Sequence, residues 1–316
     1  MGPDQAIPVS QAFWPLLLAL AERGRDPARL PAADAALRLT ASQGLAAAGD
    51  STGAQVIWRS RAGWCCGQGL AGDARDFVEL YLPICQPVRG PARIAAHLGQ
   101  SLDGCIATRS GDAQSVTGPE NFAHLHRMRA LSDAVLVGAG TVASDDPRLT
   151  TRLVSGPSPV RVILDPRGRL GAGYRVFTDG AAATLLCRGE GVTGPAPDGV
   201  ETLPLPRAGK GLDLGALVRA LAARGLRRLF IEGGGVTVSA FLAAGLLDRL
   251  QVAVAPVIIG GGRCGVDRPP VDRMAQALRP PGRIYQMGAD VLYDFDLRQA
   301  AEGGRTRAPV GFRRLR

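Results

Sequence analysis

The sequence has almost no lysine, no long apolar stretch and no paired cysteine motif. Lys210 is the only lysine, so 36 of the 37 basic residues are arginines. The apolar run from Ala12 to Ala21 is too short to span a bilayer and has no basic segment before it, so we expect a core-facing helix that ends near Gly24. None of the six cysteines forms a Cys-x-x-Cys pair and no secretory signal is seen, which predicts reduced thiols in the cytoplasm.

Several catalytic motifs are also missing. The sequence contains no His-x-Glu with Pro-Cys-x-x-Cys, so it lacks the site of a zinc deaminase. The three histidines, His97, His124 and His126, form no His-Glu-x-x-His metal motif, and no Gly-x-Ser-x-Gly elbow of a serine hydrolase occurs. A site without a metal ion is therefore expected.

The net charge of +9 is unevenly distributed along the chain. Residues 1–90 sum to zero, residues 91–301 carry +5 and residues 302–316 carry +4. No nucleic-acid motif and no basic stripe interleaved with aromatic residues occurs, so a solvated, disordered basic tail is favoured over a nucleic-acid-binding arm. The many arginines place rigid, bidentate anion binders wherever the fold needs a cation.

A length of 316 residues with 46% hydrophobic content allows one large or two modest domains. The first 90 residues show two helical patterns, a short strand and a further helix, at 12–23, 31–48, 55–59 and 72–81. The segment 83–91 breaks the pattern with three prolines and a glycine, and is the predicted domain boundary. Residues 1–90 are expected to form an α or α+β extension of unknown role.

From Ala92 onward, strands alternate with helices, which predicts an α/β sheet with covered faces. The last two apolar runs flank the segment 287–290 and suggest an antiparallel hairpin, so the sheet is expected to be mixed. The segment 189–211 is expected to be a long loop. The predicted strands lie at 92–98, 133–137, 160–164, 183–187, 227–231, 249–259, 284–287 and 290–297, and the predicted helices at 119–130, 212–224 and 236–247.

One glycine motif matches a dinucleotide-binding fingerprint, but the residues after it leave too little room for the helix that the fingerprint requires. The segment 135–143 follows an apolar strand and contains Gly-x-Gly-x-x-Ala. The fingerprint must open a helix of several turns, but Pro147 follows closely and biases Asp146 away from the α region. The segment is therefore expected to be a tight glycine turn followed by an acidic loop.

A second glycine motif is a better candidate for binding an anion. A buried strand ends at Glu232, three glycines follow, and a helix begins directly after them. Exposed N–H groups and the positive end of the helix would cradle a phosphate, and the conformational cost of three glycines favours this over a plain turn. The Lys-Ser/Thr of a P-loop is absent. Arg129 and Arg152 lie beside loops and are either surface charges or a clamp for a phosphorylated substrate.

Taken together, these segments resemble the reductase domain of riboflavin biosynthesis, which is the C-terminal half of a bifunctional deaminase/reductase and also occurs in stand-alone relatives. The resemblance covers residues 92–297, about two-thirds of the chain. It rests on the order and spacing of Ser101–Gly104, Arg129-Ala130, Asp133–Gly138, Gly140–Val142, Asp145–Thr150, Pro159–Asp165, Glu232–Gly235 and Ala255-Pro256.

The resemblance implies a dihydrofolate-reductase-like fold with a mixed sheet flanked by helices, a dimer, and NADPH as cofactor. The implied cofactor-binding residues are Thr141, Asp145, Gly233, Gly234, Gly235, Val236 and Thr237. The implied substrate-binding residues are Arg129, Leu149, Arg152 and Glu232.

Two departures from the family pattern add further candidates. His97 stands where the bifunctional enzymes carry lysine, so it is a candidate catalytic residue beside Glu232; a satisfied core histidine is the alternative. Pro166 replaces a frequent serine, so Arg167, or Arg169, is the candidate partner of the NADPH 2′-phosphate.

The predicted function is NADPH-dependent reduction of the ribosyl C1′ of 5-amino-6-(5-phosphoribosylamino)uracil to a ribityl chain. Residues 1–90 match nothing in the deaminase half, so no deamination is expected. One alternative is a reductase of the same fold that acts on another pterin-like or natural-product heterocycle, and another is a non-catalytic nucleotide-binding scaffold. A cytoplasmic homodimer without nucleic-acid or membrane partners is expected.

Overall fold

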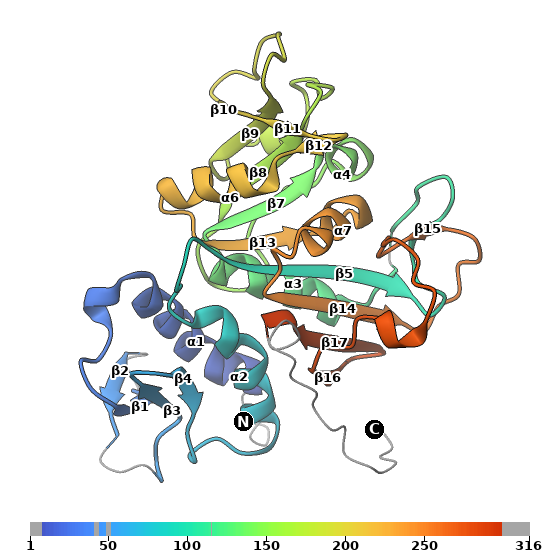
Figure 1. The fold of residues 1–316 in the computed structure, drawn as a ribbon. Helices are drawn as coiled ribbons and strands as arrows, with labels where there is room; N and C mark the ends of the chain where they lie inside the picture. The colour runs from blue at the N-terminus through green and yellow to red at the C-terminus, as the bar shows by residue number, and fades with distance from the viewer. Residues whose placement is uncertain (1–7, 41–43, 49–51, 115, 299–316) are drawn as a thin grey trace, which may run out of the picture. The chain divides into compact units, whose positions relative to one another are not determined.

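The computed structural model describes residues 8–40, 44–48, 52–114 and 116–298 (Figure 1). The chain divides into two compact units, residues 1–90 and residues 91–316. The predicted basic tail, 302–316, lies outside the described residues. No helix in the described ranges has the length and apolar character needed to cross a bilayer.

The first unit combines two helices with a four-stranded antiparallel sheet of order β2-β1-β3-β4. The two helices pack together, with the rings of Trp14 and Tyr81 edge to face at 6.0 Å. Its elements are α1 (Val9–Arg25), a 3-10 turn (Pro27–Arg29), β1 (Ala35–Leu39), β2 (Leu45–Ala47), β3 (Val56–Arg59), β4 (Gly63–Cys66) and α2 (Gly72–Cys85).

The helical pattern predicted at 31–48 is wrong, because β1 and β2 occupy that segment. Alanine and leucine favour a helix by propensity, but β1 is hydrogen-bonded to β2 on one side and to β3 on the other. Pairing with neighbouring strands outweighs a weak intrinsic preference.

The second unit contains a nine-stranded mixed sheet of order β10-β9-β8-β7-β13-β5-β14-β17-β16. The strands from β10 to β14 are parallel, and β17 and β16 add an antiparallel hairpin at one edge. Its strands are β5 (Arg93–Ser101), β6 (Cys105–Ala107), β7 (Ala134–Gly138), β8 (Val160–Asp165), β9 (Thr184–Gly189), β10 (Glu201–Leu205), β11 (Arg207–Ala208), β12 (Gly211–Leu212), β13 (Arg228–Glu232), β14 (Arg249–Ala255), β15 (Arg263–Cys264), β16 (Gly282–Met287) and β17 (Asp290–Asp296).

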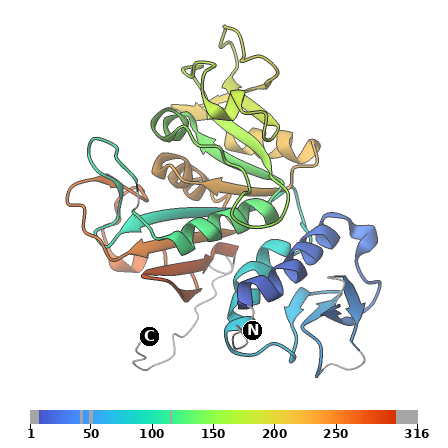
Figure 2. The same ribbon diagram turned by 180° about the vertical axis from the view of Figure 1, so that it is seen from behind.

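Helices cover both faces of this sheet (Figures 1 and 2). Helices α6 and α7 lie on one face, where side chains such as Leu217 and Phe241 join Leu136, Val162 and Ile231 of the strands in one apolar core. Helix α3 lies on the opposite face. The helices are α3 (Pro119–Leu131), α4 (Ala139–Asp145), α5 (Arg175–Thr178), α6 (Leu214–Ala223) and α7 (Gly235–Ala243), with a 3-10 turn at Met274–Gln276.

The predicted α/β class, the mixed sheet and its flanking helices are confirmed. Each of the eight predicted strands and three predicted helices from Ala92 onward has a counterpart at nearly the same residues. The short apolar runs and the helical patterns therefore placed most elements of this unit correctly.

Two predictions in this unit are wrong. The segment 189–211 is not a plain loop, because β10 extends the sheet at its edge, a position that tolerates a proline such as Pro204, and β11 pairs with β12. The expected turn and acidic loop after Gly138 is the short helix α4. Two helical turns fit before Pro147, and the helix ends at Asp146 in a left-handed conformation (φ 40°).

Candidate functional site

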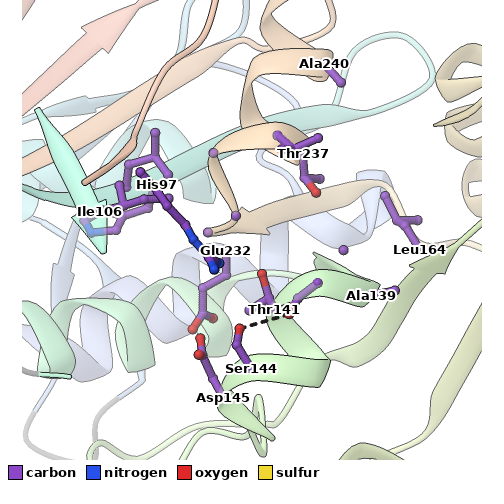
Figure 3. Close-up of a pocket in the computed structure, with 18 of the residues that line it drawn as sticks. His97, Ile106, Ala139, Thr141, Ser144, Asp145, Leu164, Glu232, Thr237 and Ala240 are labelled. Carbon is purple, nitrogen blue, oxygen red and sulfur yellow. Dashed lines mark hydrogen bonds between the residues drawn. The ribbon is translucent and has the colours of Figure 1, made fainter. Parts of the chain in front are cut away.

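A cavity of about 1110 Å³ lies in the second unit, at the carboxyl ends of β8, β7 and β13 and alongside β5 (Figure 3). Ligands bind at such strand ends in open α/β sheets, because loops and helix N-termini converge there. The sequence-predicted site residues that line it are His97, Thr141, Asp145, Leu149, Glu232, Gly233, Gly234, Gly235, Val236 and Thr237.

The turn between β13 and α7 brings backbone directly against the cavity. Gly233 and Gly234 both have positive φ, 76° and 73°, which other residues adopt only with strain. A Cβ on Gly234 would lie 2.9 Å from Thr141 Oγ1, so an added side chain would force the threonine to move. The first N–H groups of α7 have no carbonyl partner within the helix and carry the positive end of its dipole. The turn can therefore hold a phosphate or pyrophosphate.

Helix α4 supplies the wall facing this turn. Thr141 and Asp145 are four residues apart, so they share one face of the helix, and both line the cavity (Figure 3). Ser144 Oγ donates to Gly140 O at 2.9 Å within the helix. Asp146 closes the helix and accepts two hydrogen bonds from Arg175, from its backbone N at 2.7 Å and from its Nε at 3.0 Å. These contacts fix the end of α4 at the cavity.

Glu232, at the end of β13, is held by Arg129 of α3. Arg129 Nε donates to Glu232 Oε2 at 2.6 Å and its Nη2 donates to Oε1, which makes a bidentate pair. Arg129 Nη1 donates to Thr150 O at 2.8 Å. Arg129 is 6% exposed and does not line the cavity. Arg129 therefore orients the carboxylate of Glu232, and the structure does not place it as a free phosphate clamp.

Arg152 and Leu149 follow α4 along the chain. Leu149 is buried, lines the cavity and has a positive φ of 55°. Arg152 is exposed, and its backbone N donates to His126 Nδ1 at 2.8 Å. Arg129, Arg148 and Arg152 bring several positive charges together outside the Glu232 end of the cavity. Partial burial and repulsion from Arg129 and Arg148 lower the pKa of Arg152.

His97 lies on β5 next to Glu232, in register with it on β13, and points toward it (Figure 3). It is 3% exposed, and its ring interacts with the side chain of Asn121 on α3. Burial, with a further contribution from His124, lowers the pKa of His97 well below its usual value. The neutral imidazole offers one donor and one acceptor to the cavity.

A polar row crosses the sheet at this level, under helix α3. Glu232, His97, Gln251 and Asp294 are Cα partners on four neighbouring strands. Gln251 Nε2 donates to Asp294 Oδ1 at 3.2 Å, and Gln251 Oε1 lies 2.9 Å from His124 Nε2. The site is thus continuous with a buried, hydrogen-bonded network.

Near the loop that follows β8, the residues that line the cavity differ from the sequence prediction. Arg167 is exposed and does not line it, whereas Pro166 and Arg169 do. Lys210, between β11 and β12, lines the same end. Sequence reasoning also missed Asn121 of α3, which lines the cavity and is buried. A polar residue on the buried face of a helix was the available signal.

No group of three histidine, cysteine, aspartate or glutamate side chains gathers as a metal site within the residues that the structure describes. The donors around the cavity suit an organic ligand with a phosphate group.

Comparisons with known proteins agree with this geometry. The family model described as the RibD C-terminal domain matches residues 92–292. The chain is 34% identical over 217 residues to the 2,5-diamino-6-ribosylamino-4(3H)-pyrimidinone 5′-phosphate reductase of Methanothermobacter thermautotrophicus, which covers 65% of this chain and 98% of that one. It is 36% identical over 167 residues to the riboflavin biosynthesis protein RibD of Aquifex aeolicus, covering 52% of this chain and 46% of that one.

Among solved structures, the deaminase/5-amino-6-(5-phosphoribosylamino)uracil reductase of Thermotoga maritima matches with a TM-score of 0.58 at 27% identity. The match covers 72% of this chain and 64% of that chain. The chain therefore spans nearly all of the archaeal reductase and only part of the longer RibD proteins.

Proposed function

The chain belongs to the RibD C-terminal domain family, and from that premise we propose that it reduces the ribosyl C1′ of 5-amino-6-(5-phosphoribosylamino)uracil with NADPH. The observation that carries the proposal is one cavity that joins a glycine turn suited to a pyrophosphate with an oriented carboxylate, Glu232. A dinucleotide and a second small molecule then lie against each other in a shared site.

The residues around the glycine turn fit a nicotinamide dinucleotide. The N–H groups at the start of α7 receive its pyrophosphate, and Gly234 leaves no side chain in the way. Thr141 and Asp145 hold it from the α4 side. When bound, NADPH supplies the hydride for the reduction. Arg169 and Lys210, which line the far end of the cavity, replace Arg167 as the proposed partners of the 2′-phosphate.

The substrate lies at the opposite end, beside β5 and α3. Glu232 accepts hydrogen bonds from the ribose or the pyrimidine, and its pair with Arg129 fixes where its oxygens point. Leu149 packs against the substrate, and exposed Arg152 attracts its phosphate. His97, which lines the cavity in register with Glu232, contacts the reacting end. Holding the acceptor carbon in one orientation is the main contribution of these residues to the rate.

The test is direct. Purified protein is mixed with NADPH and the deaminated ribosylamino-pyrimidine phosphate, and the loss of absorbance at the nicotinamide band is followed. Consumption of NADPH that depends on the pyrimidine is expected. Tight NADPH binding without turnover of any pyrimidine would contradict the proposal.

A second candidate substrate is 2,5-diamino-6-ribosylamino-4(3H)-pyrimidinone 5′-phosphate, which carries an amino group on C2 of the pyrimidine in place of the carbonyl oxygen of the uracil. The name of the Methanothermobacter relative, nearly all of which this chain covers, favours it. Parallel kinetics with both pyrimidines decide between them, because the true substrate has the higher kcat/KM.

A homodimer in the cytoplasm, without nucleic-acid or membrane partners, is also proposed. Leu102, Val257 and Ile258 expose apolar side chains on one surface, where Leu102 N donates to Val257 O at 2.8 Å. Exposed apolar groups of this kind favour association. Light scattering after gel filtration should give twice the monomer mass, and a monomer would contradict it.

A further inference from the structure

The imidazole of His126, on α3, contacts two separate parts of the site. It is 2% exposed and does not line the cavity. On one side, its Nδ1 accepts hydrogen bonds from the backbone N of Arg152 at 2.8 Å and from that of Leu153 at 3.2 Å. On the other side, its Nε2 lies 3.3 Å from Arg129 Nη1. His126 therefore stands between Arg129 and the segment 150–153.

The two backbone donors fix the protonation state of the ring. An amide N–H only donates, so Nδ1 is the unprotonated nitrogen and the proton of the neutral ring is on Nε2. Arg129 Nη1 is also a donor and gives its hydrogen bond to Thr150 O at 2.8 Å, so it packs against Nε2. Burial, with the charges of Arg129 and Arg152, lowers the pKa of His126 to about 4, which agrees with an uncharged ring. The imidazole therefore acts as a hydrogen-bond acceptor toward the segment.

The segment that His126 holds has no helix or strand of its own. Residues 150–153 lie between α4 and β8, so their backbone groups need partners outside a regular ladder. Two of the N–H groups donate to His126, and one of the carbonyl groups accepts from Arg129. Two side chains that are three residues apart on one face of α3 thus take the place of neighbouring strands.

This segment carries or adjoins two proposed substrate contacts. Leu149 precedes it, lines the cavity and has a φ of 55°, a left-handed conformation that leucine keeps only where its surroundings impose it. Arg152 lies within the segment, and its own backbone N is bonded to His126, so the imidazole determines where the arginine side chain begins. Groups that are fixed before the substrate arrives lose less freedom when it binds.

We propose that His126 is a positioning residue, which holds the segment 150–153 so that Leu149 and Arg152 meet the substrate in one arrangement. This inference rests on the proposed function, since Leu149 and Arg152 are its substrate contacts. His126 lies outside the cavity wall, so it acts through these residues and not on the reacting atoms.

Two variants separate the acceptor of the ring from its bulk. His126→Asn carries an amide oxygen as many bonds from the backbone as Nδ1 and can accept from the same N–H groups, whereas His126→Leu keeps apolar bulk without an acceptor. With the full chain and saturating NADPH, His126→Leu should raise KM for the ribosylamino-pyrimidine phosphate about tenfold and change kcat less than about threefold. His126→Asn should keep both constants within about threefold of the wild type.

A folded His126→Leu variant with the wild-type KM would overturn the proposal, as would an equal rise of KM in His126→Asn or a loss confined to kcat. His126→Ala replaces the leucine variant if leucine prevents folding. The matched control is Ser132→Ala, which removes a buried hydrogen bond at the end of the same helix, where Ser132 Oγ donates to Met128 O at 2.8 Å. The control should keep the wild-type KM.

Amide hydrogen exchange gives a second readout that needs no turnover. In the peptide that contains residues 150–153, followed by mass spectrometry, exchange should be slow in the wild type and in His126→Asn. It should be at least about tenfold faster in His126→Leu, because two N–H groups have lost their acceptor. Equal exchange in all three proteins would overturn the positioning role. If exchange behaves as expected but the wild type reduces no pyrimidine, the proposed function is wrong and the hold on the segment stands.

Discussion

Individual side chains at the site have divided roles that their residue types do not reveal. Arg129 and Arg152 are both arginines near the same cavity end, but Arg129 is buried and makes a bidentate pair with Glu232, whereas Arg152 is exposed. A guanidinium already satisfied by a carboxylate is a poor ligand for a second anion. One arginine therefore positions the site, and the other remains available to a phosphate.

Replacing Glu232 by glutamine should lower kcat/KM for the ribosylamino-pyrimidine by about 10- to 100-fold, because a charge-assisted hydrogen bond contributes more than a neutral one. The glutamine also weakens the pair with Arg129, so a thermal melt is needed to verify folding. Steady-state kinetics on the folded variant provide the measurement. An unchanged kcat/KM would exclude a substrate role for Glu232.

Replacing Arg152 by alanine should raise KM more for the phosphorylated substrate than for its dephosphorylated analogue, because the lost cation faces the phosphate. Arg167→Ala is the matched control, because both arginines are exposed and outside the cavity wall, whereas the charge of Arg152 lies near Glu232 and that of Arg167 follows β8. Initial rates with both substrates give the ratio of KM values. Equal effects of Arg152→Ala on the two substrates would contradict the phosphate contact.

At the scale of elements, the site depends on close approach between the β13–α7 turn and helix α4. Gly234 and Thr141 face each other so closely that an added methyl group would displace the threonine hydroxyl. The sequence predicted the glycine turn because three glycines follow a buried strand, but the helical form of α4 was missed. A two-turn helix has too few residues for a periodic pattern to be recognised.

Replacing Gly234 by alanine should weaken NADPH binding by tenfold or more. The new Cβ would lie 2.9 Å from Thr141 Oγ1, and alanine strains the positive φ. Gly245→Ala is the matched control, because Gly245 has a similar φ of 65° beyond the other end of α7, with no atom within 4 Å of the added carbon. Isothermal titration with NADPH should show the loss only for Gly234→Ala.

At the scale of the whole molecule, the second unit carries the cavity and all of its wall residues. Residues 1–90 are proposed to be an extension that catalysis does not require, since the archaeal relative is matched over 98% of its own length by 65% of this chain. A fragment of residues 91–298 should therefore keep kcat/KM within a few-fold of the full chain. A folded fragment without activity would show that the extension contributes to the reaction.

Buried histidines make the stability of the second unit depend on pH. Burial lowers the pKa of His124 from 6.5 to about 4, so the unfolded chain takes up a proton in a range where the folded chain does not. Stability should be greatest above pH 6.5 and should fall as the pH drops toward 4. Urea unfolding at several pH values measures this, and His124→Gln should give a shallower decline. A parallel decline in the variant would assign the effect to other groups.

The local pattern of the sequence determined eight of the thirteen described strands and three of the five described helices of the second unit, the glycine turn and Glu232 at its edge, because apolar runs, helical period and turn chemistry act over a few residues. Only the tertiary structure decided which side chains meet. Arg129 and Glu232 are 103 residues apart, and His124 and Gln251 are 127 apart. Strand order and register set these contacts, and no local pattern encodes them. The same long-range pairing placed His97 and Asn121 in one cavity wall.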